Sequence, residues 1–365
     1  MKILIVRVSS LGDVVHNMPM VSDLRRHFPD AQIDWVVEEA YVELVRLHAD
    51  VQRVIPFALR RWRKSLQTAG TRAEIAACFK QLRSVAYDII FDTQGLFKTG
   101  ALMRVARLAP GGRRVGLANA TEGSGYEGLS RIFHDQSVPV GVRTHGVTRA
   151  REVAARALDY SLEHEPVHGE AHEQAHAAAI DRPHGEVDFR LGVPQPEPVP
   201  DCLPSGAYAL FFHATARAAK QWSVEGWVQL ADTLAQRGMQ VLLPWGSPAE
   251  RVAAQALAAK MKNALVLPKI SVMEAIALIR RAAVVVGVDT GLTHIAAALR
   301  RPTIELYCDS PRWKTEGFWS SNIINLGDTG TPPTPAEVDA ALTELIGTVG
   351  VTLQQTFSEE SAESE

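Results

Sequence analysis

The sequence has few cysteines and no surplus of charge of either sign. Only Cys78, Cys202 and Cys308 occur among 365 residues, and they lie far apart. An odd number of cysteines without metal-ligand spacing argues against a disulfide framework and a structural zinc site, and it favours a reducing, cytoplasmic environment. The formal net charge of −3 leaves no global basic surplus, so the composition gives no indication of nucleic acid as a partner.

Long hydrophobic runs are also missing. No segment reaches the roughly 20 apolar residues that a membrane-spanning helix needs. The apolar start of the chain is interrupted by Arg7 and by Asp13 and has no small-residue cleavage site, so we interpret it as a core strand and not as a signal peptide. The first half lacks the Gly-x-Gly-x-x-Gly fingerprint, so no nicotinamide or flavin cofactor is expected, and no metal site is predicted.

Apolar runs alternate with amphipathic segments along most of the chain. This alternation predicts an α/β fold with two Rossmann-like, doubly wound parallel sheets, because right-handed crossovers through helices bring successive strands into one sheet. A length of 365 residues suits two domains. In the first half we expect strands at 2–8, 32–37, 53–56 and 87–92 and helices at 14–28, 41–49 and 72–85. In the second half we expect strands at 208–213, 241–244, 264–267, 284–288 and 303–307 and helices at 224–237, 248–261, 271–281, 292–299 and 336–349.

Composition places the domain boundaries. The first domain is expected at 1–170 and the second at 205–330, with a linker region at 171–204, a C-terminal helix at 331–350 and an acidic, disordered tail at 351–365. The prolines between 193 and 200 fit neither a central strand nor a helix. The histidines between His164 and His184 are irregularly spaced among Glu and Ala, so a solvated helix is favoured over a metal site.

Residues 285–303 contain the most informative functional pattern. An apolar strand runs into a polar turn that opens a helix, and a helix start has unpaired backbone N–H groups and a partial positive charge. A phosphate at this turn would gain further hydrogen bonds from Thr290, Thr293 and His294, and Gly291 would let the backbone approach it closely. The alternative is that Asp289 only caps the helix.

Two other turns of the second half follow the carboxyl ends of expected strands, where ligands bind in open α/β sheets. Thr215 and Lys220 offer a hydroxyl and a point charge for phosphate oxygens, and Glu250 offers a carboxylate for a ribose diol. Each has a plain alternative, since Lys220 would otherwise be a surface cation and Glu250 an ordinary acid in the first turn of a helix. Together with the Asp289 turn, they predict a site for a nucleoside diphosphate.

The first half begins with a turn of the same kind and contains clustered cations. Residues 9–13 connect the first strand to a helix and place Asp13 near its start, although a serine- and glycine-rich connection is the plain alternative. Two such turns predict two similar domains that face one central cleft. Cations surround an aromatic residue at 60–64, and Arg143, Arg149 and Arg151 add others. Guanidinium groups suit phosphate or carboxylate partners, whereas the alternative is a solvated face.

Five segments together resemble the lipopolysaccharide heptosyltransferases of the inner core, in particular those that add the first heptose, which are glycosyltransferases with the GT-B fold. They are 2–16 (KILIVRVSSLGDVVH), 92–98 (DTQGLFK), 213–222 (HATARAAKQW), 243–250 (LPWGSPAE) and 289–294 (DTGLTH). The resemblance covers most of the chain. It implies transfer of heptose from ADP-heptose, a co-substrate, to the Kdo of Kdo2-lipid A, with inversion at the sugar carbon and without a cofactor. It also implies a cytoplasmic enzyme bound peripherally to the inner membrane.

The resemblance implies roles for individual positions. Asp13 matches the proposed general base of the family. The positions that match the donor site are Thr215, Lys220, Glu250, Asp289, Thr290, Gly291, Leu292 and His294. The cations that match candidates for the anionic acceptor are Arg60, Arg61, Arg63, Lys64 and Lys98. Ala216 departs from the pattern, because a second hydroxyl residue is expected there; no role is carried onto the linker or the tail.

Three alternatives stay open at this point. A heptosyltransferase that adds the second heptose, or another GT-B transferase with a different donor, differs mainly in loops of the first half that choose the acceptor. A non-catalytic nucleotide-binding protein on the same two sheets would not release ADP from ADP-heptose. A sugar-nucleotide epimerase would need a second acid–base pair beside Asp13, which the sequence does not supply.

Overall fold

The computed structural model describes residues 1–162, 186–194, 197–198, 203–215 and 217–347. The chain divides into two compact units, Met1–Gly192 and Val193–Glu365, and the division falls within the segment that the sequence marks as a linker. The histidine-rich segment, Ala216 and the acidic tail lie outside the described residues. Among the residues that are described, no helix combines the length and the apolar character needed to cross a membrane.

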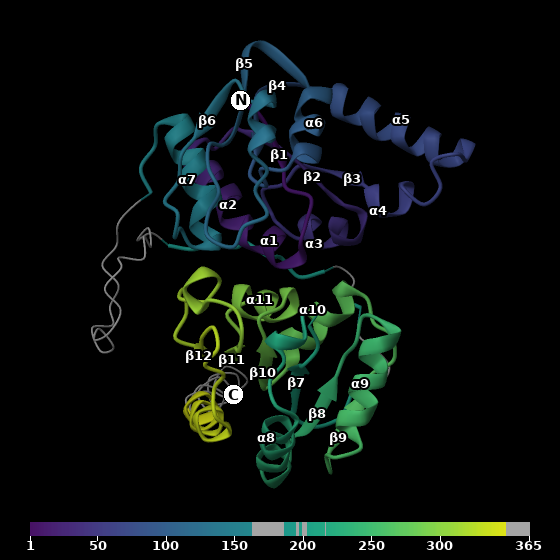
Figure 1. Ribbon diagram of the computed structural model, residues 1–365, viewed down its shortest axis with the longest axis vertical. Coiled ribbons are helices and arrows are strands. Elements are labelled where there is room, and N and C mark those ends of the chain that lie inside the picture. Colours follow the sequence, from purple (N-terminus) through teal and green to yellow (C-terminus); the bar gives the residue numbers. More distant parts are fainter. Residues whose placement is uncertain (163–185, 195–196, 199–202, 216, 348–365) are drawn as a thin grey trace, which may run out of the picture. The chain divides into compact units, whose positions relative to one another are not determined.

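The first unit is built on one parallel sheet. Its strands are β1 (Lys2–Val6), β2 (Gln32–Glu38), β3 (Arg53–Phe57), β4 (Ala86–Asp92), β5 (Arg107–Leu117) and β6 (Gln136–Val138). They lie in the order β3-β2-β1-β4-β5-β6 (Figure 1). The central strand β1 is continuously apolar because both of its faces are covered, and Ile3 to Val6 have no exposed surface. This order is that of a doubly wound sheet and confirms the predicted α/β class for this unit.

Helices connect these strands. They are α1 (Leu11–His16), α2 (Met18–His27), α3 (Val42–Arg46), α4 (Leu59–Trp62), α5 (Ala69–Arg83), α6 (Phe97–Val105) and α7 (Gly146–Leu158), with short 3₁₀ segments η1 (Glu39–Tyr41) and η2 (Gly128–Phe133). The prediction of one helix at 14–28 is wrong, because α1 and α2 are separate. Pro19 lies in the first turn of α2, where its missing N–H is not needed, but it could not have continued α1.

A buried ion pair joins α2 to α7. Arg151 is 1% exposed, and its guanidinium donates through two nitrogens to the carboxylate of Asp23, with Nε 2.6 Å from Oδ2. The expectation that Arg151 is a cation for an anionic ligand is wrong, because Asp23 occupies it inside the unit. Loss of either partner would leave a buried charge uncompensated, so the pair fixes the position of α7.

The second unit is also built on one parallel sheet. Its strands are β7 (Tyr208–Phe212), β8 (Gln240–Leu243), β9 (Ala264–Val266), β10 (Val284–Val288), β11 (Thr303–Tyr307) and β12 (Ile323–Gly327). They lie in the order β12-β11-β10-β7-β8-β9, and every neighbouring pair is parallel. Counted from its own first strand, this is the order of the first unit. The prediction of a second doubly wound sheet is therefore confirmed.

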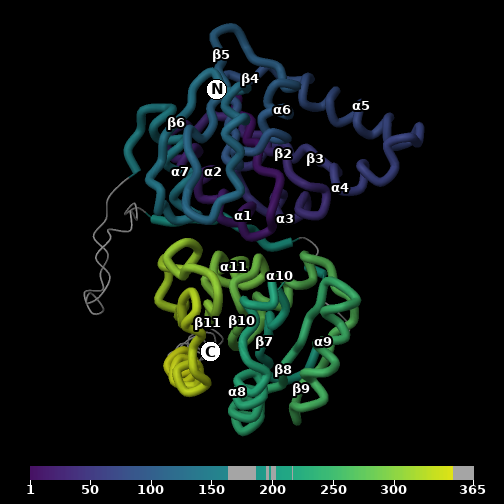
Figure 2. The backbone as a smooth tube through the Cα atoms, viewed as in Figure 1, coloured from purple at the N-terminus to yellow at the C-terminus, as the bar shows by residue number. Residues whose placement is uncertain are grey.

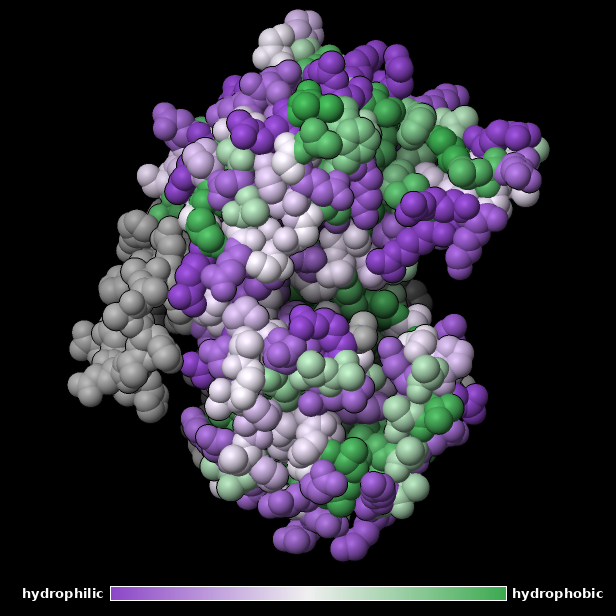
Figure 3. All heavy atoms as spheres, in the orientation of Figure 1, coloured by the Kyte–Doolittle hydropathy of each residue, from purple (hydrophilic) through white to green (hydrophobic). Residues whose placement is uncertain are grey.

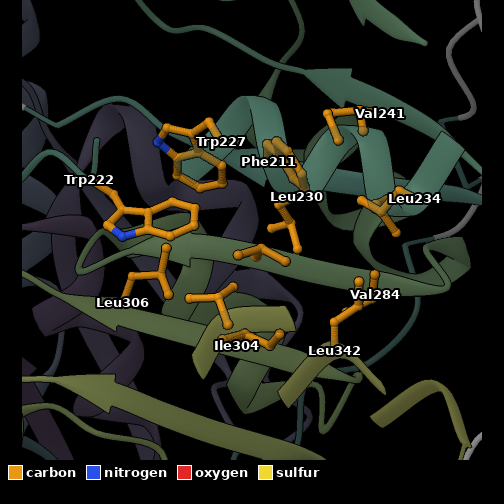
Figure 4. Packing of buried hydrophobic residues seen from close by; sticks show 14 of the residues in the cluster. Phe211, Trp222, Trp227, Leu230, Leu234, Val241, Val284, Ile304, Leu306 and Leu342 are labelled. Carbon is orange, nitrogen blue, oxygen red and sulfur yellow. The ribbon is translucent and has the colours of Figure 1, made fainter. Parts of the chain in front are cut away.

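Helices and aromatic side chains complete the second unit. The helices are α8 (Val224–Gln236), α9 (Pro248–Ala258), α10 (Val272–Arg281) and α11 (Gly291–Ala298), with 3₁₀ segments η3 (Ala218–Lys220) and η4 (Arg312–Lys314) and a last helix at 335–347. Trp222 and Trp227 pack edge to face in the core, with ring centroids 5.2 Å apart (Figure 4). Trp222 precedes α8 and Trp227 lies within it, so the start of this helix is anchored on the sheet.

The polar turns occupy equivalent places in the two topologies. Each sheet changes its winding direction beside its first strand, between β1 and β4 and between β7 and β10, and ligand crevices form there at the carboxyl ends of strands. The turn that leads to Asp13 follows β1, whereas the turns with Lys220 and Asp289 follow β7 and β10. The path from β10 directly into α11 can be followed in Figure 2. The fold therefore places the predicted side chains where such sheets bind ligands.

Candidate active site

Asp289 and Lys220 form an ion pair at the carboxyl ends of two neighbouring strands. Because β10 pairs with β7, the turns that follow these strands meet. Lys220 Nζ lies 2.5 Å from Asp289 Oδ2, and the two side chains are 19% and 9% exposed. Burial raises the pKa of Asp289, but hydrogen bonding to His294 and the charge of Lys220 outweigh this effect and hold it well below its ordinary value. Asp289 is therefore ionised at neutral pH.

His294 links this ion pair to a second buried carboxylate. Its Nε2 lies 3.0 Å from Asp289 Oδ1, and its Nδ1 lies 3.1 Å from Glu305 Oε1. Burial lowers the pKa of His294, but the two carboxylates raise it to about 10. An imidazole ring donates from both nitrogens only when it is protonated. His294 is therefore an imidazolium at neutral pH.

The bonds of Asp289 decide between the two interpretations of its turn. The residue at the cap position of α11 is Thr290, and its side chain makes no capping bond. The Asp289 carboxylate contacts the side chains of Lys220, His294 and Thr315. Asp289 therefore organises a group of side chains and does not serve as a simple helix cap. Thr290, together with Gly291 and Leu292, lies half-buried at the start of the helix, where a phosphate was predicted.

Close packing holds α11 against β10. Thr293 Oγ1 donates to the Val288 carbonyl at 2.8 Å and lies 3.2 Å from Thr290 Oγ1. A Cβ added to Gly287 would lie 2.2 Å from Thr293 Oγ1, so only glycine lets the helix approach the strand this closely. Thr293, one of the two threonines that the sequence offers as phosphate donors, thus has a structural bond to the strand.

The turns after β7 and β8 add further polar groups. Glu250 Oε2 accepts the backbone N–H groups of Gly246 and Ser247, at 2.7 and 3.1 Å. These contacts are those of an ordinary acid in the first turn of a helix, which was the plain alternative for Glu250. A contact between Glu250 and a ribose diol stays a prediction. Thr215 is half-buried. His213 is 7% exposed, burial lowers its pKa, and its Nε2 has no hydrogen-bond partner among the residues described.

Asp13 lies at the start of α1 between two guanidinium groups. Arg7 NH2 is 2.5 Å and Arg149 NH2 is 3.8 Å from its Oδ1. Ser10 donates to Oδ2 through its backbone N–H at 3.0 Å and its hydroxyl at 2.8 Å. Partial burial raises the pKa of Asp13, but the two arginines and Ser10 hold it well below its ordinary value. The side chain is 41% exposed, so the carboxylate is both ionised and accessible.

The turn after β4 supports the turn 9–13. Asp92 is fully buried and accepts the backbone N–H groups of Gln94 and Gly95, at 2.9 and 3.0 Å. Gln94 Oε1 in turn accepts the N–H of Val8 at 3.0 Å. Segment 92–98 is one of the five that carry the family resemblance. It therefore holds the backbone at Val8, just before the turn that leads to Asp13.

The cation cluster at 60–64 contains residues with different environments. Arg61 donates to Glu39 and Glu74, with NH2–O distances of 2.9 and 2.7 Å. Trp62 is 4% exposed, donates to Glu74 Oε2 at 2.8 Å and packs against Phe57 with ring centroids 5.3 Å apart. The expectation that Trp62 belongs to a surface site is wrong, because its ring is part of the core. The guanidinium of Arg61 is already engaged by two carboxylates.

The other predicted acceptor cations are more accessible. Arg60, Arg63 and Lys64 are exposed, and Lys98 is half-buried. Burial raises the pKa of Glu38 at the end of β2, and the charges of Arg60 and Lys98 lower it. The charges of these two cations therefore both act on one carboxylate. The structure thus places Arg60 and Lys98 within electrostatic range of Glu38 and leaves Arg63 and Lys64 on the exposed turn after α4.

The sequence did not predict the roles that three residues of these sites have in the structure. Glu305 lies in an apolar strand and has no motif around it, and the only sequence signal at Arg7 is a charge that interrupts the first apolar run. Arg149 was expected to bind an anion, and it does so within the chain, because it contacts Asp13 and donates to Thr121 Oγ1 at 3.0 Å. A lone charged residue inside a buried strand is the sequence signal that would have indicated Glu305.

Comparisons with known proteins agree on one group. The family described as glycosyltransferase family 9 (heptosyltransferase) matches residues 75–342. Lipopolysaccharide heptosyltransferase 1 of Pseudomonas aeruginosa is 38% identical over 307 residues, which cover 84% of this chain and 78% of that protein. The protein of the same name from Escherichia coli K12 is 37% identical over 324 residues, which cover 89% and 93% of the two chains.

Solved structures give the same result. E. coli heptosyltransferase WaaC with ADP has a TM-score of 0.76 and 33% identity, and the match covers 94% of this chain and 100% of that chain. WaaC with ADP-2-deoxy-2-fluoro heptose has a TM-score of 0.71 and 34% identity, over 94% and 99% of the two chains. E. coli ADP-heptose lps heptosyltransferase II, at 21% identity and a TM-score of 0.68, shares the fold.

Proposed function

This chain belongs to glycosyltransferase family 9, the heptosyltransferases, and from that premise we propose that it moves L-glycero-D-manno-heptose from ADP-heptose to the Kdo of Kdo2-lipid A. Its fold is the GT-B type expected from the sequence. One observation in the structure carries most weight for the donor: the second unit holds Lys220 and His294 around Asp289 at the switch point of its sheet.

The charge of this donor group suits a leaving diphosphate. Lys220 and the His294 imidazolium place two positive charges against the one negative charge of Asp289, and the second carboxylate on His294, that of Glu305, is fully buried on β11. Negative charge grows on the diphosphate as the sugar–phosphate bond breaks, and a positive group already in place stabilises the transition state more than the ground state. We propose that these side chains and the start of α11 bind ADP-heptose without a metal or cofactor.

We propose Asp13 as the general base. The acceptor hydroxyl becomes strongly acidic once its oxygen begins to bond to the anomeric carbon, so a carboxylate of low pKa can accept the proton late in the reaction. Arg7 and Arg149 keep Asp13 ionised, and its partial exposure leaves it accessible to substrate. Attack from the face opposite to the leaving ADP would invert the configuration at the sugar carbon.

The accessible cations of the first unit suit an anionic acceptor. We propose that Arg60, Arg63, Lys64 and Lys98 contact the charged sugars of Kdo2-lipid A. Arg61 would contribute less, because Glu39 and Glu74 already neutralise it.

The main alternative is a transferase that adds the second heptose. Four relatives named heptosyltransferase 1 are 36–38% identical to this chain and a fifth is 21% identical, whereas a heptosyltransferase 3 is 24% identical. This difference favours the first heptose and therefore Kdo as the acceptor sugar.

Incubation of the purified chain with ADP-heptose and Kdo2-lipid A tests the proposed reaction. We expect release of ADP and a lipid product whose mass has increased by one heptose. Transfer only to an acceptor that already carries one heptose would identify the second-heptose enzyme. Binding of ADP-heptose without any release of ADP would identify a non-catalytic protein.

The first unit has an exposed hydrophobic patch that suits a lipid surface. Leu129 and Ile132 are 69% and 67% exposed and lie three residues apart in η2, where residues at this spacing share one side. Phe97, at the start of α6, is 48% exposed, and its ring packs against Phe133 of η2 with centroids 5.1 Å apart. Figure 3 shows a hydrophobic region over α6 in this unit. We call Phe97, Leu129 and Ile132 the apolar patch.

Cations border the apolar patch. Lys98 follows Phe97 in the sequence, and Arg131 is exposed between Leu129 and Ile132. One acid is also close, since Glu127 Oε2 accepts the N–H of Phe97 at 2.6 Å. Exposed apolar side chains next to cations are typical of proteins that bind anionic bilayers. We propose that this patch enters the headgroup region on the cytoplasmic side of the inner membrane and brings the acceptor cations to the lipid.

Removing the apolar character of the patch should weaken membrane binding. The double variant Leu129→Asp with Ile132→Asp should bind vesicles that contain phosphatidylglycerol at least about tenfold more weakly, because it loses two insertable apolar side chains. Sedimentation with vesicles measures this change. Val252→Asp is the matched control, because Val252 is 66% exposed on α9 of the second unit, and it should bind like the wild type. Wild-type binding by the double variant would exclude the patch, and transfer to a deacylated, soluble acceptor should be normal in both variants.

A further inference from the structure

Glu305 is a buried acid that takes no part in the transfer as described above. It lies on β11 opposite Gly287 of β10 and has no exposed surface. Its Oε1 contacts His294 Nδ1, and its Oε2 accepts the N–H of Gly317 at 2.7 Å and the hydroxyl of Tyr307 at 3.2 Å. A carboxylate taken fully out of water requires a partner charge, and here that partner is the imidazolium ring.

His294 is in contact with two carboxylates, and other polar and charged side chains lie beyond them. Asp289 faces Nε2 from the end of β10, and Glu305 faces Nδ1 from β11. The groups one contact further away are Lys220, beyond Asp289, and Tyr307, beyond Glu305. The charge of Glu316 acts on Tyr307, and its carboxylate pairs with Arg312. The buried residues of α10, which also packs on α11, are the apolar residues 275–279. The protonation of His294 therefore depends chiefly on the two carboxylates.

The charge of His294 determines how strongly Asp289 neutralises Lys220, because both side chains contact the same carboxylate. With the imidazolium in place, two cations contact the Asp289 carboxylate, and the charge of Glu305 lies at the opposite nitrogen of the ring. With a neutral imidazole, Lys220 would be the cation left at Asp289, and the site would lose one positive charge there. Lys220 would then be held more strongly by Asp289, and the binding of a diphosphate would weaken.

We propose that Glu305 is a positioning residue for the donor, which holds His294 as an imidazolium directed at Asp289 and thereby leaves Lys220 available to the diphosphate. This inference rests on the proposed donor site of the second unit. Glu305 acts through His294 and makes no contact of its own with the nucleotide in this scheme.

The variant Glu305→Gln tests the inference through pH. Gln keeps the size of the side chain and removes its charge, so the pKa of His294 should fall from about 10 toward its ordinary value of 6.5. A raised pKa keeps the ring charged until the pH passes it, so wild-type KM for ADP-heptose should stay nearly constant between about pH 6 and pH 9. In the variant the same KM should rise by at least about tenfold across this range, because the imidazolium is lost.

Two further variants separate charge from structure. Glu305→Asp keeps the negative charge and should restore most of the flat pH profile. Glu316→Gln is the matched control, because Glu316 is also buried in this unit and its carboxylate lies 3.2 Å from Arg312 Nε. It should leave the pH profile of the donor KM unchanged.

A titration of His294 by NMR gives a readout that does not depend on transfer. In the wild type its ring should stay protonated up to about pH 9, and in Glu305→Gln it should titrate at lower pH. Parallel pH profiles of donor KM in wild type and Glu305→Gln, or a loss that is the same at every pH, would overturn the inference. If the wild type transfers no heptose, the proposed function fails, whereas the NMR titration and the pH dependence of ADP affinity still decide the role of Glu305.

Discussion

The variant Asp13→Asn should reduce kcat by about 10²- to 10⁴-fold, the usual contribution of a general base. Asn has the shape of Asp and can still bond Ser10, but it cannot accept the proton of the acceptor hydroxyl. The two arginines keep other partners, since Arg7 donates to the Thr93 carbonyl and Arg149 to Thr121 Oγ1. Steady-state kinetics should therefore show a loss of turnover in a protein that unfolds at nearly the wild-type temperature.

Affinity for ADP distinguishes this loss from a general defect. The donor group is built within the second unit, so calorimetry should give an ADP affinity close to that of the wild type. Ser10→Ala is a suitable control, because it removes one hydroxyl bond to Asp13 and keeps the carboxylate, and its kcat should fall less than about tenfold. Near-normal turnover by Asp13→Asn would reject Asp13 as the base.

The pH dependence of the wild type adds a check on the same residue. A carboxyl whose pKa is lowered in the folded protein stays ionised above that pKa and is protonated only when the pH falls through it. Asp13 should therefore cause no decline of kcat near pH 4, where an ordinary Asp would be protonated.

The variant Lys220→Ala should lower kcat/KM for ADP-heptose by about 10²- to 10³-fold, as expected for the loss of a preorganised charge at a leaving group. The change removes one of the two cations that contact Asp289 and so takes one positive charge from the donor group. KM should rise and kcat should fall together, because both ground-state binding and the charge of the leaving diphosphate depend on Lys220. Initial rates at varied ADP-heptose measure both quantities.

An exposed lysine of the same unit provides the control. Lys262 is 82% exposed at its side chain and lies 3.1 Å from Asp232, so Lys262→Ala removes the same charge from the unit without touching the donor group. Its kinetics should stay within about twofold of the wild type, as is usual for exposed pairs. Wild-type kinetics in Lys220→Ala would remove Lys220 from the phosphate site.

The fold could be predicted wherever a strand is buried on both faces. The ranges expected for β10 and β11 are those observed, because an unbroken apolar run between helices has few other solutions. The sequence did not indicate β5, β6 or β12. Strand β5 contains Pro110 and three glycines, its pairing with β4 shifts register, and none of its first eight residues is buried. Without burial on both faces, such a strand has no apolar pattern to detect.

The candidate site could be predicted less completely, because its contacts come from segments far apart in the sequence. The motif at 289–294 indicated Asp289 and His294, but not that Glu305 of a neighbouring strand holds the ring from the other side. Adjacent residues also separate in space: Trp62 turns into the core while Arg61 pairs with two acids. A cluster of cations in sequence therefore does not define one surface.

The position of bound ADP tests most directly whether the second unit binds the donor and the first unit supplies the base. A crystal structure of the chain soaked with ADP should show the diphosphate in the second unit, bonded to Lys220 and to the start of α11 beside Asp289. ADP bound in the first unit beside Asp13 and Arg149 would contradict the assignment of both the donor site and the base.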